Sequence, residues 1–126
     1  MASELRVDTL KDSSGNNSVG MAYVSNGSAK AWMHYTTIGT TAAQDSLNVA
    51  SVTDNGSGST DANWSSVFAN DDYATTTSCE RSGFYHAMLH GIANTATNHI
   101  TLTAATAVNS AEDIEEGHCI CMGDLA

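Results

Sequence analysis

Three histidines and two cysteines in the second half of the chain are residue types that bind metal ions. They are His86, His90, His118, Cys119 and Cys121. Zinc takes four nitrogen or sulfur ligands in a tetrahedron, and two histidines four residues apart chelate it well from a helix. In a strand, the same spacing separates His86 from His90 by roughly 13 Å, at about 3.3 Å per residue. We expect a strand there, so the sequence predicts no metal and no cofactor, with zinc at these residues as the alternative.

Acidic clusters offer oxygen ligands for calcium at residues 54–61 and 70–72. Neither cluster has the EF-hand order of acidic residues, and neither has the closing glutamate. We therefore expect both to be solvated turns. The acidic stretch at residues 112–116 is also expected to be solvated, and a charged contact with a basic partner or a neighbouring subunit is its alternative.

Common catalytic motifs do not occur in the sequence. It contains no Gly-x-Ser-x-Gly nucleophile elbow, no phosphate-binding loop and no His-Glu-x-x-His pair. Asp45, Ser46 and one of the histidines could be assembled into a triad, but most proteins offer such a combination. We expect a protein that is not an enzyme and has no catalytic residue, and a small hydrolase is the alternative.

The composition allows only a thin hydrophobic core. Leu, Ile, Val and Phe make up 20 of the 126 residues, and the formal net charge is −10. One copy of such a chain buries too little apolar surface to offset its conformational entropy comfortably, so we expect copies to share a core. The negative charge excludes a general nucleic-acid binder, which needs a cationic face. No apolar run is long enough for a transmembrane helix.

Short segments separated by turn residues predict an all-β protein. Residues 3–10 alternate apolar and charged side chains, which indicates a strand with one solvated face. A second strand is expected over residues 19–24, ending at the hairpin signal Asn26-Gly27. Further strands are expected over residues 30–36, 46–53, 62–68, 73–79, 84–89, 100–104 and 118–122, and a short helix only near residues 111–116.

Eight or nine such strands predict an antiparallel β-sandwich with a jelly-roll-like arrangement. Residues 30–126 would form this domain, whereas residues 1–29 are too short for a core of their own and indicate an attachment segment. Leu5, Val7 and Leu10 are the candidate attachment residues of that segment, because an edge strand offers a row of hydrogen-bonding groups to a partner.

The few large side chains are the candidate core anchors. They are Trp32, Leu47, Val49, Trp64, Phe68 and Tyr73. Stacking on a sugar is the alternative for the two tryptophans. Alternation over residues 30–36 places Trp32 and His34 on one face of the strand and Met33 on the other.

The three cysteines, Cys79, Cys119 and Cys121, do not have the spacing of a disulfide framework. We expect buried thiols in a protein that is made in a reducing cytoplasm. Because Cys119 and Cys121 are two residues apart in a predicted strand, their side chains should point the same way.

Several short motifs follow one another in an order that resembles a known family. They are Lys30-Ala31-Trp32, Asp45-Ser46, Asn48-Val49, Asp54-Asn55-Gly56-x-Gly58, Asn63-Trp64 and Asp72-Tyr73-Ala74. Together they resemble a small β-domain common in bacteriophages of marine bacteria, whose members are generally tail fibre or virion structural proteins. Residues 3–16 also resemble the start of such proteins. The chain departs from the pattern at Met33, His34 and Tyr35 and in its last strand.

This resemblance implies a bacteriophage virion protein that is made in the host bacterium and displayed on the particle. It implies a homotrimer in contact with other virion proteins, with no nucleic acid and no membrane insertion. A tail fibre-like role in host attachment, with a host-surface glycan as a possible ligand, is the first expectation. A capsid decoration protein and a stand-alone carbohydrate-binding module are the alternatives.

Overall fold

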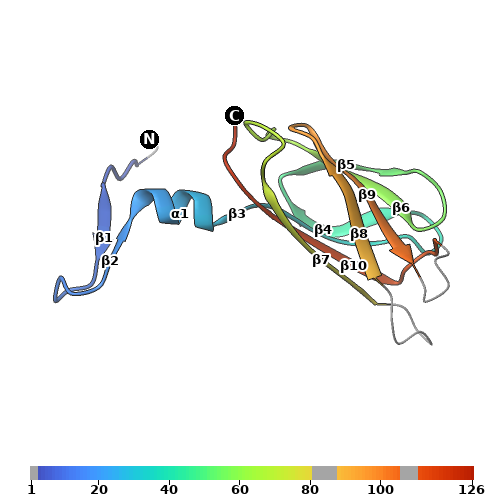
Figure 1. Ribbon diagram of the computed structural model, residues 1–126, viewed down its shortest axis with the longest axis horizontal. Helices are drawn as coiled ribbons and strands as arrows, with labels where there is room; N and C mark the ends of the chain where they lie inside the picture. The colour runs from blue at the N-terminus through green and yellow to red at the C-terminus, as the bar shows by residue number, and fades with distance from the viewer. Residues whose placement is uncertain (1–2, 81–87, 106–110) are drawn as a thin grey trace.

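The structure is a computed structural model, and it describes residues 3–80, 88–105 and 111–126. Most of the strand predicted over residues 84–89 lies outside this range. Figure 1 shows the elements in chain order. They are β1 (Thr9–Lys11), β2 (Ser18–Gly20), α1 (Met21–Gly27), β3 (Ala29–Thr36), β4 (Ala42–Leu47), β5 (Val49–Asp54), β6 (Ser59–Trp64), β7 (Ala74–Glu80), β8 (Met88–Asn94), β9 (Asn98–Ala105) and β10 (Glu116–Met122).

Two four-stranded sheets face each other and form what we call the two-sheet body (Figure 1). The first sheet has the strand order β4-β3-β10-β7, and the second has the order β5-β6-β9-β8. Every pairing that the structure describes is antiparallel. The prediction of an all-β protein built from antiparallel sheets is therefore confirmed.

The described part of the core between the sheets contains several small side chains. Among the residues whose burial is described, the buried apolar ones are Ala31, Met33, Tyr35, Ala62, Trp64, Phe68, Tyr73, Ile114, Cys119 and Cys121. The largest group is aromatic: the Phe68 and Tyr73 rings stack with centroids 4.1 Å apart. Trp64 meets Phe68 edge-on at 5.7 Å, and its Nε1 donates to Tyr73 Oη at 3.3 Å. Burial raises the pKa of Tyr73 to about 12, which keeps its hydroxyl protonated at neutral pH.

Two of the predicted core anchors, Trp32 and Leu47, lie on the outer face of the first sheet instead, and Leu47 is 47% exposed. Alternation allows β3 to bury either Met33 and Tyr35 or Trp32 and its polar neighbours. The first choice keeps the ammonium group of Lys30, which shares the outer face with Trp32, out of the interior, where an unpaired charge would be costly. Val49 is half-buried and packs against the core.

The strand predicted over residues 46–53 is in fact two strands, in different sheets. Asn48 separates them with a φ of 60°, a left-handed conformation that asparagine tolerates better than most residues. Its side chain fixes the bend, because Nδ2 donates to Ser66 O at 2.9 Å and Oδ1 accepts from Ser66 N at 2.6 Å. The chain therefore passes from the first sheet to the second at Asn48.

Residues 3–28, which we call the N-terminal segment, extend away from the two-sheet body (Figure 1). β1 pairs with β2, and the side chain of Asp12 stabilises the turn between them. The Asp12 carboxylate accepts hydrogen bonds from the Asn17 side chain at 2.7 Å and from the backbone N–H groups of Ser14 and Asn16. These bonds, the Asn17 bond foremost, lower the pKa of Asp12.

The helix α1 replaces most of the strand predicted over residues 19–24, of which only Val19 and Gly20 lie in β2, and the hairpin predicted at Asn26-Gly27 does not form. The pairing of β2 with β1 ends at Gly20, and Met21 N then donates to Asp8 O at 3.0 Å. Met21 and Ala22 are good helix formers, and a glycine such as Gly27 commonly ends a helix as well as turning a hairpin. Among the described residues, no helix has the length and apolar character to cross a membrane.

Residues 111–116, where the sequence predicts a short helix, do not form one. Ile114 is buried, and three hydrogen bonds join it to the last residue of β3 and the residue after it, one of them from Thr36 Oγ1 to Ile114 O at 3.3 Å. Ile114 N donates to Thr37 Oγ1 at 2.7 Å, and Ile114 O accepts from Thr37 N at 3.0 Å. Pairing with another part of the chain replaces the bonds that a helix would have made within the segment.

Gly117 offers a test of this packing. An alanine Cβ at this position would lie 2.7 Å from Ile114 Cδ1 and closer still to the Tyr35 ring, both in the core. Because overpacking a core is destabilising, we expect Gly117→Ala to lower the free energy of unfolding by about 1–3 kcal/mol, measured by urea denaturation. Gly27→Ala is the control, since nothing lies within 4 Å of its Cβ, and its effect should stay within about 0.5 kcal/mol. Equal urea midpoints for the two variants would contradict this packing.

Candidate functional site

The outer face of the first sheet carries the side chains that could interact with a ligand or partner. β3 buries Met33 and Tyr35 on its inner side and leaves Trp32 and His34 on the outer side, as the alternation predicts. β10 alternates in the same way, with Cys119 inside and His118 and Ile120 outside. The outer face is thus built from every second residue of neighbouring strands.

An apolar row crosses this face from one edge of the sheet to the other. Leu47 on β4 pairs with Trp32 on β3, and Trp32 pairs with Ile120 on β10. Ile120 in turn pairs with Thr76 on β7, and Met122 lies two residues further along β10. Ile120 is 43% exposed and Leu47 is 47% exposed. Leu47, Trp32, Ile120 and Met122 thus leave apolar surface uncovered on the outer face of the sheet.

A polar row runs beside the apolar one, in the order Asp45, His34, His118 and Ser78. The two imidazoles stack with centroids 4.8 Å apart and planes inclined by 9°. His118 Nδ1 lies 3.4 Å from Ser78 Oγ. His34 Nε2 is buried and has no hydrogen-bond partner among the described residues. The pair therefore contains one ring nitrogen, His34 Nε2, whose hydrogen-bonding capacity the described residues leave unused.

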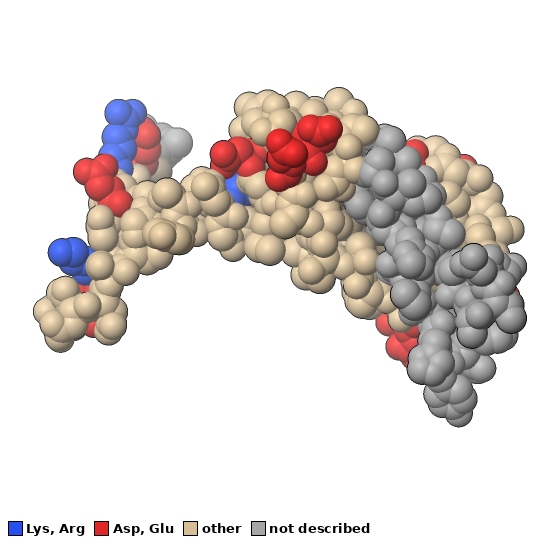
Figure 2. Space-filling model, viewed as in Figure 1, with Lys and Arg blue, Asp and Glu red and all other residues tan. Residues whose placement is uncertain are grey.

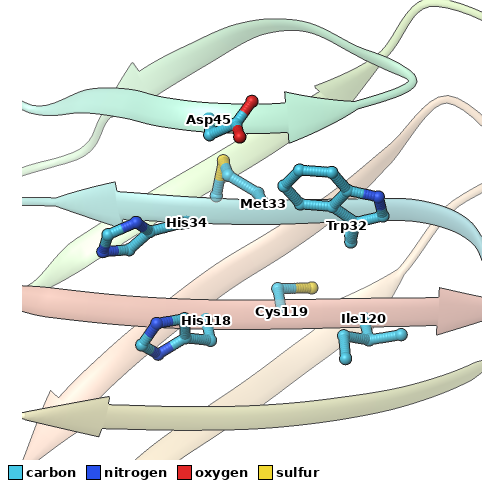
Figure 3. A pocket seen from close by; sticks show the side chains of 7 residues that line it. All are labelled: Trp32, Met33, His34, Asp45, His118, Cys119 and Ile120. Carbon is cyan, nitrogen blue, oxygen red and sulfur yellow. The ribbon is translucent and has the colours of Figure 1, made fainter.

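A shallow hollow of about 310 Å³ joins the two rows. Figure 3 shows the His34 and His118 rings side by side at one end and Trp32 with Ile120 at the other. Asp45 lies on the neighbouring strand, and Met33 and Cys119 complete the lining. The hollow combines an apolar surface with imidazole and carboxylate groups.

Glu116 adds a carboxylate to the histidine pair. It is two residues before His118 on β10 and therefore on the same face. The ligand atoms of His34, Glu116 and His118 all lie within 4.8 Å of one another. Glu116 also pairs directly with Glu80 on β7, so two carboxylates stand opposite each other at this edge of the group.

The zinc ligand set that the sequence offers as an alternative is not brought together. Cys119 and Cys121 point into the core, with their sulfur atoms 3.6 Å apart, whereas His118 points outward from the same strand. The hydrogen bond with Cys121, together with burial, raises the pKa of Cys119 and keeps its thiol neutral. His86 lies outside the described residues, and His90 is described only by its place in β8.

Sequence reasoning missed His34 and Glu116 as members of a site. Glu116 and His118 form a Glu-x-His pair that, in a strand, must share a face, and this signal was available in the sequence. The position of His34 depends on the pairing of β3 with β10, which joins the beginning of the two-sheet body to its end. No local pattern indicates that pairing.

Carboxylate oxygens of the first acidic cluster considered for calcium, residues 54–61, accept hydrogen bonds from the turn itself and from Thr41. Asp54 Oδ1 accepts from Gly56 N at 2.8 Å, and its Oδ2 accepts from Thr41 Oγ1 at 3.0 Å. Asp61 Oδ1 accepts from Asn55 Nδ2 at 2.8 Å. These bonds stabilise the turn conformation, as expected for solvated turns.

Asp45 and Ser46 are adjacent in the sequence but lie on opposite faces of β4. Asp45 pairs with the outward-facing His34, and Ser46 pairs with the buried Met33. Asp45 Oδ1 accepts from Ser46 N at 2.8 Å. This arrangement points the hydroxyl of Ser46 away from His34, so these residues do not form a nucleophile and base pair.

The candidate attachment residues Leu5, Val7 and Leu10 are all exposed, Leu5 at 79%. Val19 and Tyr23 expose further apolar surface on the same segment. Among the described residues, no hydrogen bond or ion pair joins residues 3–24 to the two-sheet body.

Charge is distributed unevenly between the two parts (Figure 2). The N-terminal segment carries Arg6 and Lys11 against three acids. The described residues of the two-sheet body carry eleven Asp and Glu against Lys30 alone. The body is therefore strongly acidic, and its single described lysine lies at the junction with the N-terminal segment.

No protein family, curated protein or solved structure matches this chain.

The two tryptophans report on opposite sides of the first sheet. Trp64 is 5% exposed and Trp32 is partly exposed. We expect acrylamide to quench the fluorescence of the Trp64→Phe protein, which retains Trp32, much more strongly than that of Trp32→Phe. The emission of Trp64→Phe should also lie at longer wavelength. Both are measured at nanomolar concentration so that self-association does not cover the face. Stronger quenching of the Trp32→Phe protein would mean that β3 presents its other face to solvent.

Proposed function

We propose that this chain is a non-enzymatic structural protein of a bacteriophage virion, displayed on the particle as a homotrimer and attached through its N-terminal segment. A tail fibre-like role in host attachment is the form we favour. The motifs from Lys30 to Ala74 that resemble phage virion proteins, and the open outer face of the first sheet, support this proposal.

The exposed N-terminal segment is the observation that carries the proposal. It extends from the two-sheet body and exposes Leu5, Val7, Leu10, Val19 and Tyr23. A two-stranded ribbon of this size is marginal in water by itself. Apolar surface that the chain leaves uncovered in this way is typical of a segment that becomes ordered against a partner protein.

Shared burial between copies is supported by the distribution of large apolar residues. Those exposed in the described chain are Leu5, Val7, Leu10, Val19, Tyr23, Ile38, Leu47, Val67, Ile120, Met122 and Leu125. Among the residues whose burial the structure describes, they outnumber the large buried side chains of the core. Of these, Leu47, Ile120 and Met122 lie with Trp32 on the outer face, where three copies could bury them together. The pairing of β3 with β10, the first and last strands of the body, supports a jelly-roll-like arrangement.

The acidic two-sheet body suits a protein on the outside of a particle. Its negative charge disfavours nonspecific contact with packaged DNA and with anionic cell surfaces. The N-terminal segment has nearly balanced charge, which lets it contact another virion protein without the repulsion that the body would meet. This distribution matches a chain with one attached end and one displayed end.

A capsid decoration protein would use the same segment and the same trimer, so copy number separates the two roles. A decoration protein is abundant on the capsid, whereas a fibre occurs in a few copies at the tail.

A stand-alone carbohydrate-binding module is favoured by one observation, the partly exposed Trp32 beside Asp45 in the hollow. An indole can stack on a sugar ring, and a neighbouring carboxylate can accept hydrogen bonds from its hydroxyl groups.

Trimer formation through the outer face can be measured by light scattering. We expect the intact chain to show three times its mass of 13.1 kDa at low micromolar concentration. Ile120→Asp should shift it toward the monomer, because a carboxylate would be buried in the shared apolar surface. Val67→Asp, at a position of similar exposure outside that face, should leave the trimer intact. A cooperatively folded monomer for the unaltered chain would contradict the trimer.

Attachment can be tested on particles of a phage that encodes the chain. The triple variant Leu5→Ser, Val7→Ser, Leu10→Ser should be lost from purified particles, because the partner can no longer bury those side chains. The control double variant Ile38→Ser, Val67→Ser changes exposed apolar residues of the body and should remain particle-bound.

Mass spectrometry of the particles gives the copy number of the chain, and cryo-electron microscopy gives its position on the particle. Absence of the unaltered chain from particles would overturn the virion role, and glycan binding without particles would favour the carbohydrate-binding module.

A further inference from the structure

We propose that His34, Glu116 and His118 form a binding site for a divalent first-row transition metal ion, for which Zn²⁺ is the probe. The three side chains come from neighbouring strands of one sheet, and their ligand atoms lie within 4.8 Å of one another. This inference rests on the geometry of a single chain and does not depend on the virion role.

Small side-chain movements would bring the three donors into coordination. An ion with bonds of about 2.0–2.2 Å in a tetrahedron holds its ligand atoms ~3.4 Å apart. Strand pairing already places His34 directly opposite His118, with Glu116 two residues away on the same face. Rotation about side-chain bonds therefore closes the remaining distance, and the backbone can stay where it is.

The surroundings of the two imidazoles suit metal binding. If the Nδ1–H of His118 donates to Ser78 Oγ, at 3.4 Å, then its Nε2 presents a lone pair. Hydrogen bonds of this kind commonly orient metal-binding histidines. His34 Nε2 is buried without a partner among the described residues, and a bound ion would supply that partner.

The charges around the group favour a cation. Glu116 and Glu80 are directly paired across β10 and β7, and like charges in such pairs repel each other. Asp45 lies opposite His34 on the other side of the pair. The only Lys or Arg among the described residues of the body, Lys30, donates to Ser25 O and Ser28 Oγ. A divalent ion at Glu116 would offset this unbalanced negative charge.

The donor set selects the class of ion. Two imidazoles and one carboxylate suit Zn²⁺ and its neighbours, whereas Ca²⁺ and Mg²⁺ prefer oxygen ligands alone. Cys119 and Cys121 face the core, so their thiols do not belong to this site. Three protein ligands leave one position open, next to the hollow that Trp32 and Ile120 line. A water molecule or a group from a bound partner can take that position.

Isothermal titration of Zn²⁺ into the chelator-stripped, tag-free full chain tests the site. We expect saturable binding of one ion per chain. His34→Gln, His118→Gln and Glu116→Gln should each weaken binding at least about 10-fold. Asp72→Asn is the matched control, because it removes an exposed carboxylate outside the group, and it should change the affinity less than about 2-fold. Metal-free circular dichroism and thermal melting establish that each variant is folded.

Cobalt substitution separates this site from a cysteine site. The Co²⁺ form should show ligand-field bands without a thiolate charge-transfer band, because no sulfur coordinates the ion. A thiolate band would overturn the assignment. The same conclusion would follow if micromolar Zn²⁺ failed to bind to the unaltered chain, or if Asp72→Asn weakened binding as much as Glu116→Gln.

Discussion

The pairing of β3 with β10 is the constraint on which the rest of the structure depends. It places His118 opposite His34 and Gly117 opposite Tyr35. A shift of one residue in this register would turn the buried side chains of one strand to the solvent, because alternate residues face opposite sides. Gly117 helps to hold the register, since the Tyr35 ring occupies the space that a Cβ would need. The core on one face and the histidine pair on the other are two results of the same pairing.

Local patterns predicted that the two-sheet body consists of short strands, but they did not fix the bounds of β4, β6 and β8 or which face of each strand is buried. The alternation of β3 was predicted correctly, yet the large indole of Trp32 suggested burial of the wrong face. That choice depends on what the second sheet supplies, namely Trp64 together with Phe68 and Tyr73 from the following connection. The bend at Asn48 is a second feature that local patterns did not predict. Residues 46–53 were predicted as one strand, but the two halves of this run pair in different sheets.

The candidate site was harder to predict than the strands, because it combines residues that are far apart in the sequence. Glu116 and His118 share a face by spacing alone, whereas His34 joins them only through the sheet order. The sequence pattern also suggested combining His118 with Cys119 and Cys121, but adjacent residues of a strand cannot point the same way. Exposed positions at the N-terminal segment were easier to predict, since a short alternating stretch without a core of its own leaves Leu5 and Leu10 uncovered.

The alternation of strand direction divides the loops of the body into two groups. β3 leaves the N-terminal segment and runs away from it, and each following strand reverses direction, so the C-terminus returns to the end where β3 begins (Figure 1). The connections at residues 37–41, 55–58 and 112–115 lie together at the opposite end, where Gly58 N donates to Asp113 Oδ1 and Thr37 N donates to Ile114 O. If the N-terminal segment attaches the chain as proposed, this far end points away from the attachment site. Substitutions at the tip residue Ser57 would then change the outermost surface, whereas Gly39, with its φ of 76°, is needed for the shape of its turn.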